Sequence, residues 1–335
     1  MRTNIQTKCR RSVALVGLLL LLATVVSAQT IRIGSSAPEN SPWGRALNRL
    51  AVEWREASNG RVRVQVFHNS IAGQEADMIR KMRIGQLQAI VITNVGLSSF
   101  SDQVMTLSMP LLIRNEAEYD YVFERVREEL EEDIEDDGFR VMAWSSAGWI
   151  YPFGAQPIRT PDDMQRLKLA VSPEEQDLIK AYQLMGYQPV SISFQERLTG
   201  LVNGMANGHL SVPLLAAGFQ WFGPTPYMLD LKIAPAPGAI LLSERAYRRL
   251  PRDSRDELMA IARRMSDDLN GEIAELERTA IETMQEYGLT ILEPNEAERE
   301  LWVEELQSSY DVMLGLVFHD QMYRRISEHL DEFRN

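Results

Sequence analysis

The chain of 335 residues carries 35 basic and 47 acidic side chains, a formal net charge of −12, and 45% of its residues are hydrophobic, as in ordinary globular proteins. So acidic a surface excludes nucleic acid and anionic membranes as partners, because both repel it. The single cysteine, Cys9, excludes disulfides, thiol catalysis and cysteine-based metal sites from the remainder of the chain.

Residues 1–28 are predicted to be a secretory signal peptide. Four basic side chains precede an apolar run from Val13 to Val26, and Val26-Ser27-Ala28 supplies the small residues that a signal peptidase accepts. We expect cleavage after Ala28, a mature net charge of −16 and a periplasmic protein. Retention as an N-terminal anchor is the alternative, although the run is short for a membrane span. A lipid-attachment cysteine would follow the run, whereas Cys9 precedes it, so no lipoprotein is expected.

The first part of the remaining chain alternates between strand and helix patterns. Helices are expected between the loop at 38–43 and Asn59, and again from Gly73 to Gly85, because apolar residues recur there at helical spacing. Strands are predicted at 31–35, 62–66, 89–92 and 139–144. The helix predicted at 119–137 ends in EELEEDIEDD, a charge run that indicates a solvated face, since it lacks the glycine and spacing of a calcium loop.

A second round of the same alternation follows a stretch rich in turn formers at 149–157, which we interpret as a connection. This second round contains a helical turn capped at 161–163, strands at 167–171 and 189–193, and a helix at 174–185. Alternation of this kind predicts an α/β fold with parallel strands flanked by helices. Two such units indicate two lobes with a cleft between them.

A long helix is predicted from Ser254 to Gly288, opened by a capping box of Ser254 and Glu257. At 1.5 Å per residue it would be roughly 50 Å long, enough to span both lobes as a spine. We therefore expect lobe I to comprise 29–150 and about 240–272, and lobe II to comprise 151–239 and about 273–335.

The sequence contains no nucleophile elbow, no zinc-protease motif and no phosphate-binding loop. The histidines His68, His209, His319 and His329 are scattered, and no cluster of them with carboxylates suggests a metal site. No catalytic residue, metal or cofactor is therefore predicted. Binding of a small molecule is the favoured class of function, and an exported hydrolase is an alternative.

Four segments in order resemble the extracytoplasmic solute-binding subunit of tripartite ATP-independent periplasmic (TRAP) transporters, the DctP-like family. They are IGSSAPENSPWGRALNRLAVEWREASNGRVRVQVFHNSIAGQEADMIRKMRIGQLQAIVI, LSMPLLIRNEAEYDYVF, PIRTPDDMQRLKLAV and LTGLVNGMANGHLSVP. The resemblance implies two lobes around a cleft, crossing hinge segments, closure on a ligand and delivery to TRAP membrane permease subunits. It also allows a tetratricopeptide-repeat partner, so a scaffold that has lost transport is a further alternative.

The sequence departs from the family pattern where the resemblance places ligand contacts. An arginine that forks onto a ligand carboxylate is replaced by Ala170, a second arginine by Ile150, and an acid by Leu210. Because a buried carboxylate without a paired cation is costly, we expect the cleft to reject dicarboxylates and simple monocarboxylates and to bind a neutral or largely apolar molecule. The predicted ligand-binding residues are Trp43, Thr93, Asn94, Ser145, Trp149, Ile150, Ala170, Ser172, Asn207, His209, Leu210, Trp221 and Phe222.

Overall fold

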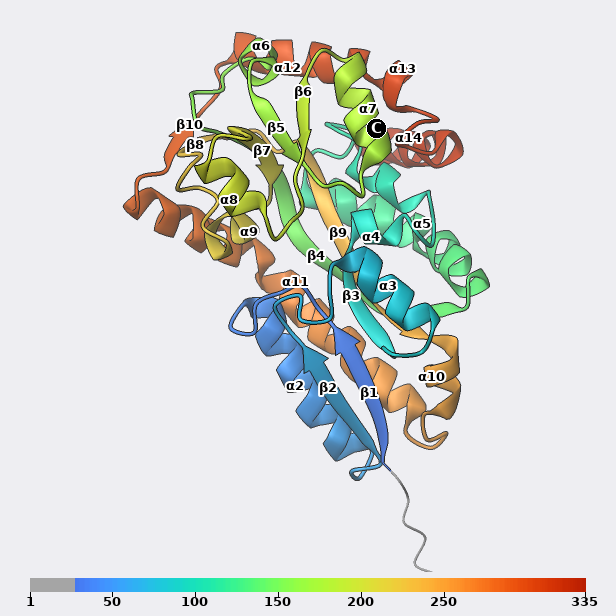
Figure 1. Ribbon diagram of the computed structural model, residues 1–335. Helices are drawn as coiled ribbons and strands as arrows, with labels where there is room; N and C mark the ends of the chain where they lie inside the picture. The colour runs from blue at the N-terminus through green and yellow to red at the C-terminus, as the bar shows by residue number, and fades with distance from the viewer. Residues whose placement is uncertain (1–27) are drawn as a thin grey trace, which may run out of the picture.

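The computed structural model describes residues 28–335. The predicted signal peptide therefore lies, apart from Ala28, outside the described residues. Within 28–335 no helix combines the length and the apolar character that crossing a bilayer requires. The fold is α/β with two lobes, as predicted, and Figure 1 shows the smaller lobe below and the larger lobe above.

Lobe I is built on three parallel strands in the order β2-β1-β3. The residues predicted as strands form them, within one or two residues of the expected ends. The elements of this part of the chain are β1 (Gln29–Gly34), α2 (Pro42–Ala57), β2 (Val62–Phe67), α3 (Glu75–Arg83), β3 (Ala89–Thr93), α4 (Asn94–Leu97), η1 (Val104–Ser108) and α5 (Glu116–Asp136), with α10 (Glu244–Arg249) returning to the lobe later.

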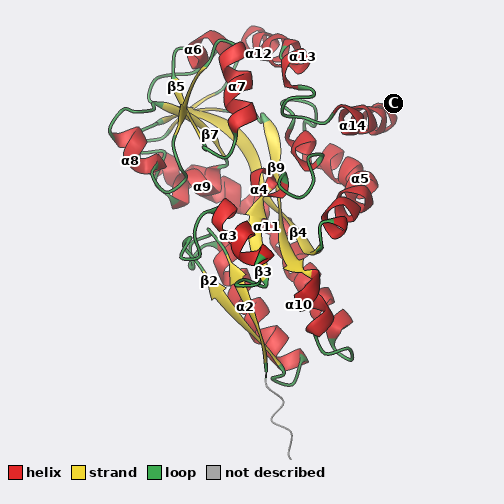
Figure 2. Ribbon diagram, turned by 45° about the vertical axis from the view of Figure 1, so that its right-hand side comes forward, coloured by secondary structure: helices red, strands yellow, loops and turns green. Residues whose placement is uncertain are grey.

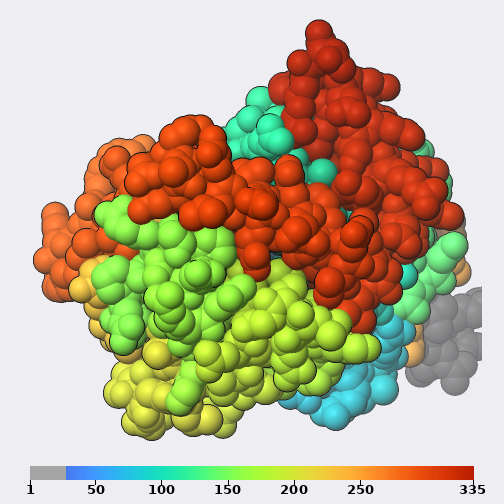
Figure 3. All heavy atoms as spheres, turned by 90° about the horizontal axis from the view of Figure 1, so that it is seen from above, coloured from blue at the N-terminus to red at the C-terminus, as the bar shows by residue number. Residues whose placement is uncertain are grey.

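Lobe II repeats the arrangement with the parallel strands β7, β5 and β6. Its helices α12 and α13 lie against α6 and α7, and Figure 3 shows them in orange-red beside the green residues of this lobe. The elements are α6 (Pro161–Gln165), β5 (Lys168–Val171), α7 (Gln176–Leu184), β6 (Gln188–Ser191), α8 (Arg197–Val202), β7 (Gly208–Ser211), α9 (Pro213–Gly218), β8 (Tyr227–Leu229), β10 (Thr290–Leu292), α12 (Glu296–Ser308) and α13 (Tyr310–Met313).

Two antiparallel strands connect the lobes, β4 (Phe139–Gly154) and β9 (Ala234–Ser243). β9 pairs with β3 in lobe I, and the distal end of β4 pairs with β7 in lobe II, so both strands run through the molecule (Figure 2). The turn-rich connection predicted at 149–157 is wrong for its first six residues, which continue β4. The turn formers Pro152 and Gly154 are accommodated in this strand, opposite Leu210 and Gly208 of β7. Just before them, a register shift between Ser146 and Trp149 leaves Gly148, at φ 100°, out of the ladder.

The long helix α11 (Arg255–Glu286) confirms the predicted spine, with 32 residues and a length of about 48 Å. It packs on α2 in lobe I, on the crossing strand β4 and on α9 in lobe II. The predicted capping box is wrong. Ser254 has ψ −1° instead of the extended conformation of a capping residue, and Arg61 instead lies within reach of its hydroxyl (3.4 Å) and of Asp253 (3.0 Å).

The C-terminal helix α14 (Asp320–Arg334) packs on α5, although our partition assigns the two helices to different lobes. Val122, Val126, Met322 and Ile326 are buried at this contact in one apolar cluster. The division of the chain into lobes at residues 150, 240 and 272 stays a prediction. The packing of α14 shows that the far C-terminus also contacts α5, the helix that precedes β4.

A partly buried ion pair fixes α14 to the start of α5. Arg334 donates Nε to Oε1 of Glu118 at 2.9 Å and Nη2 to Oε2 at 2.7 Å, and the backbone N–H of Arg114 adds a third bond at 2.9 Å. Burial acts to raise the pKa of Glu118, but these bonds outweigh it and hold the pKa below the usual 4.5. The stabilisation is therefore present above pH 4.5 and is lost as the pH falls below it.

We expect Glu118→Ala to reduce the free energy of unfolding by about 2–3 kcal/mol at pH 7, since it leaves a half-buried guanidinium unpaired. The matched control is Glu275→Ala, which breaks an exposed pair with Arg278 and should cost less than about 1 kcal/mol. Urea unfolding at pH 7 and pH 3.5 measures both, and the two variants should converge at the lower pH. Equal effects of the two substitutions at pH 7 would contradict the assignment.

Candidate functional site

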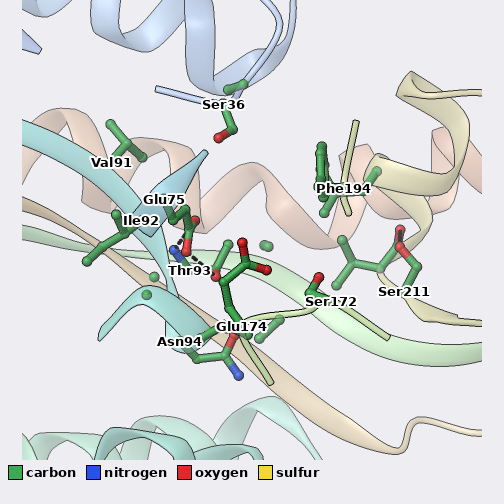
Figure 4. Close-up of a pocket in the computed structure, with 18 of the residues that line it drawn as sticks. Ser36, Glu75, Val91, Ile92, Thr93, Asn94, Ser172, Glu174, Phe194 and Ser211 are labelled. Atoms are coloured by element: carbon green, nitrogen blue, oxygen red, sulfur yellow. Dashed lines mark hydrogen bonds between the residues drawn. The ribbon is translucent and has the colours of Figure 1, made fainter. Parts of the chain in front are cut away.

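An interlobe cavity of about 330 Å³ lies where the crossing strands meet both lobes, on the face of β4 opposite a wider groove of about 1080 Å³ between α5 and α11. Lobe I contributes the end of β3 and the start of α3, the crossing strands contribute Ser145, Ile150 and Gly238, and lobe II contributes side chains from β7, α8, α9 and the loop after β5. Figure 4 shows the labelled side chains converging from these elements. The carboxyl ends of β3 and β5 face this cavity, which is where open α/β sheets place ligands.

The cavity walls are mostly apolar, and several of these side chains were not among the predicted residues. Val91 and Ile92 lie on the lobe I side, and Phe194 lies opposite them across the gap in Figure 4. Phe194, Phe219 and Trp221 form an aromatic cluster with ring centroids 4.8 to 5.4 Å apart. Such a wall favours apolar ligand surface and gives few hydrogen bonds.

Glu75 of α3 is the main polar group on the lobe I side. Its carboxylate accepts the backbone N–H of Thr93 at 2.9 Å and the Thr93 hydroxyl at 3.0 Å, so it holds the start of α4 (Figure 4). A Cβ at residue 96 would lie 2.4 Å from Oε2 of Glu75, so the close approach requires Gly96. Burial raises the pKa of Glu75 to about 7 despite these hydrogen bonds, and the Glu174 carboxylate contributes in the same direction.

The raised pKa of Glu75 makes stability depend on pH. The folded protein holds this proton more tightly than the unfolded chain does, so stability is lost as the pH rises from about 4.5 to about 7. Urea unfolding measures this effect as the free energy of unfolding of Glu75→Gln minus that of the wild type. We expect this difference to rise by about 1–3 kcal/mol between pH 5 and pH 8, because only the wild type loses stability over this range. A difference that stays constant across this range would contradict the assignment.

Arg197 at the start of α8 corrects the expectation that the cavity lacks a cation. Its side chain is 7% exposed and lines the cavity, and Nη2 donates to Oγ of Ser172 at 3.1 Å. The guanidinium lies over the Trp221 ring at 4.9 Å. Nε is buried and has no hydrogen-bond partner among the described residues.

The charge of Arg197 is only partly balanced by its surroundings. Burial lowers the pKa of Arg197, and the carboxylates Glu175 and Glu174 raise it. The guanidinium remains charged, because its ordinary pKa lies above 12. Glu175 accepts the backbone N–H of Ser172 at 3.2 Å and makes no ion pair with Arg197 within 4.0 Å among residues 28–335. The site is therefore a buried cation with free donors beside carboxylates.

A second, smaller cavity of about 130 Å³ adjoins the first, and Arg197, Glu175 and Asn94 line both. The three positions at which the sequence departs from the family pattern, Ala170, Ile150 and Leu210, also line it. Most of the remaining lining is apolar and comprises Met105, Pro110, Val171, Leu178, Tyr182, Ile233, Ala234, Met313 and Phe318, with Ser108.

The structure brings most of the predicted ligand-binding residues to these cavities. Ala170 lines only the smaller one. The predicted residues that line the larger cavity are Trp43, Thr93, Asn94, Ser145, Ile150, Ser172, Leu210 and Trp221. Their contact with a ligand stays a prediction. The prediction missed the ionisable residues of this cavity, which are Glu75, Glu174, Glu175 and Arg197.

Four predicted residues lie outside both cavities. Trp149 alternates with Ile150 along β4, so its ring turns to the opposite face and donates to Glu116 at 2.9 Å. Asn207 accepts the backbone N–H of Lys168 at 2.7 Å and holds β5 at its start. Phe222 packs against the largest apolar cluster.

His209 is a core residue and not a ligand contact. It is fully buried, stacks on Phe153 at 5.1 Å, and its Nε2 lies 3.1 Å from the Thr225 hydroxyl. Burial, with Arg197 nearby, lowers the pKa of His209 to about 3. It is therefore neutral at physiological pH.

Two lobes, two crossing strands, a shared helix and an interlobe cavity define a two-lobed solute-binding protein. The family model described as "Bacterial extracellular solute-binding protein, family 7", DctP, matches residues 33–315. The chain belongs to this family, as the sequence resemblance predicted, and its relatives include TRAP solute-binding proteins.

Relatives and solved structures agree with this assignment. A "Solute-binding protein" of Verminephrobacter eiseniae is 24% identical over 276 residues, 81% of each chain. The sugar acid binding protein of Advenella mimigardefordensis in complex with galactonate superimposes with a TM-score of 0.84 at 18% identity, over 91% of this chain and 98% of that one. A TRAP periplasmic solute-binding protein of Xanthobacter autotrophicus with bound β-D-galacturonate gives 0.81 at 20% identity, over 90% and 99%. These matches are solute-binding proteins, and they lend no support to the hydrolase or scaffold alternatives.

Proposed function

We propose that this protein is the extracytoplasmic receptor of a TRAP-type transporter, exported to the periplasm. It binds a small molecule in the interlobe cavity, closes around it, and delivers it to the membrane permease subunits. The observation that carries the proposal is the 330 Å³ cavity itself, because both lobes and both crossing strands contribute to its wall. A ligand that touches both lobes stabilises their closed arrangement.

The ligand is a molecule of no net charge with a largely apolar body. The solved relatives with bound galacturonate, galactonate and malate have anionic ligands, and Arg197 gives this cavity a cation for an acidic group. The aromatic and aliphatic walls, however, suit a ligand with far fewer hydroxyl groups than a sugar acid. The carboxylates Glu75, Glu174 and Glu175 leave no net positive charge for a second acidic group.

Mass spectrometry under native conditions of protein purified gently from its producing cells tests the receptor function. We expect a copurified small molecule that is lost on unfolding. In thermal denaturation, millimolar succinate and sialic acid should leave the melting temperature unchanged, whereas the copurified molecule should raise it by several degrees. A rise of several degrees with succinate would contradict the proposed ligand class. Absence of any bound or stabilising small molecule would contradict the receptor function.

A further inference from the structure

We propose that the cavity takes a zwitterion, an α-amino acid with an apolar side chain, whose carboxylate binds Arg197. The inference rests on the proposed receptor function and names its substrate class. Three features of the site carry it: a buried guanidinium with free donors, two carboxylates that face one another in the same cavity, and an apolar cavity that also borders the guanidinium.

The carboxylate subsite is the Arg197 guanidinium. Of its five N–H donors, one is used by Ser172, and the other four have no acceptor among residues 28–335. Arg197 is a buried residue, and its guanidinium gains most from an acceptor that satisfies two donors at once, as a carboxylate does. The ring of Trp221 beneath it fixes its plane.

The ammonium subsite lies between Glu174 and Glu75. Glu174 projects from lobe II into the cavity and points toward Thr93 and the Glu75 carboxylate of lobe I (Figure 4). Thr93 occupies part of the hydrogen-bonding capacity of Glu75, while Glu174 makes no hydrogen bond or ion pair among the described residues. Two facing carboxylates repel each other, and a cation placed between them removes that repulsion.

The carboxylates near Arg197 argue against a simple acid. Glu174 and Glu175 both act on Arg197, so an anion bound there would meet two negative charges for one positive charge. A zwitterion adds its own positive charge on the side where Glu174 and Glu75 lie. It also keeps the ligand neutral overall, so it adds no further negative charge to a cavity that already holds Glu75, Glu174 and Glu175.

The side-chain subsite is the cavity of about 130 Å³ beyond Arg197. Ala170, Ile150 and Leu210 contribute apolar side chains to its wall, and Ile150 and Leu210 also line the larger cavity. An apolar cavity of about 150 Å³ accommodates benzene, so an isobutyl or a phenyl group is of the right order of size. Leucine and phenylalanine are the natural probes.

Isothermal titration of the mature protein, unfolded and refolded to remove bound ligand, tests the three subsites with ligands that each lack one group. We expect L-leucine or L-phenylalanine to bind, 4-methylpentanoate, which lacks the ammonium group, to bind at least about tenfold more weakly, and 3-methylbutylamine, which lacks the carboxylate, about 100-fold more weakly. Glycine, which lacks the side chain, should bind about 100-fold more weakly than leucine. Equal or tighter binding of 4-methylpentanoate overturns the inference and leaves the receptor function intact.

Variants separate a binding role from a structural one. Glu174→Gln should weaken leucine about tenfold while strengthening 4-methylpentanoate, a reversal that general damage to the fold would not produce. Arg197→Gln should abolish binding of both, and the exposed Arg166→Gln is its control. Should Arg197→Gln fail to fold, the Glu174→Gln reversal decides alone. If no apolar amino acid binds while a different copurified molecule does, the inference is wrong and the receptor function stands.

Discussion

Gly148→Val should lower the free energy of unfolding by about 3–5 kcal/mol, one of the two largest effects expected from a single change in this protein. Gly148 has φ 100°, where a β-branched residue is strained, and a Cβ there would lie 2.3 Å from Oε2 of Glu277. Glu277 is buried on the spine helix α11, accepts the backbone N–H of Trp149 at 3.1 Å and is hydrogen-bonded to Tyr151. The substitution therefore strains the backbone and displaces the carboxylate that ties the spine to β4.

Gly288→Val is the matched control for this prediction. Gly288 has φ 101°, and no atom lies within 4 Å of a Cβ built on it, so its substitution adds only backbone strain of about 1–2 kcal/mol. Urea unfolding followed by circular dichroism measures both variants, and their difference reports the loss of the Glu277 contact. Equal losses of stability would show that the contact between Gly148 and Glu277 contributes nothing beyond strain.

Most of the fold could be predicted because its signals are local. Alternating valines gave β2 and a continuous apolar run gave β3 to within one residue, and the absence of proline between Ser254 and Gly288 gave the spine. The second half of β4 could not be predicted, because Gly148 and Gly154 resemble turn residues. They are accommodated by a register shift and by pairing with β7, which depend on partners far away in the sequence.

The site shows a sharper limit. The resemblance directed attention to positions 150, 170 and 210, and all three line the cavities. It could not show that a cation reaches the same place from α8, because the position of Arg197 depends on how α8 packs against Trp221. The available signal was a basic residue in FQERLTGLV, among apolar residues at helical spacing. Loss of a charged residue at one position therefore leaves a cavity without that charge only when no neighbouring element contributes a charged side chain to it.

Trp54→Ala should cost about 3–5 kcal/mol, because it removes a fully buried indole from the contact between α2 and the spine. Nε1 of Trp54 donates to the carbonyl of Leu258 at 2.9 Å, so the substitution also breaks a hydrogen bond across this contact. Trp54→Phe, which keeps most of the apolar area, should cost about 1–2 kcal/mol. Val52→Ala, on the exposed face of the same helix, should change stability by less than about 0.5 kcal/mol.

The shape of the unfolding curve tests whether the spine couples the lobes. Trp54 is part of lobe I, but α11 also packs on β4 and α9, and β4 and β9 are continuous through both lobes. We therefore expect Trp54→Ala to shift one cooperative transition as a whole, seen at the same urea concentration by circular dichroism and by fluorescence of the five remaining tryptophans, which include Trp221 and Trp302 of lobe II. Two separate transitions, with the midpoint of the tryptophan signal unchanged from the wild type, would mean that lobe I unfolds alone. In that case α11, β4 and β9 would not couple the unfolding of the two lobes.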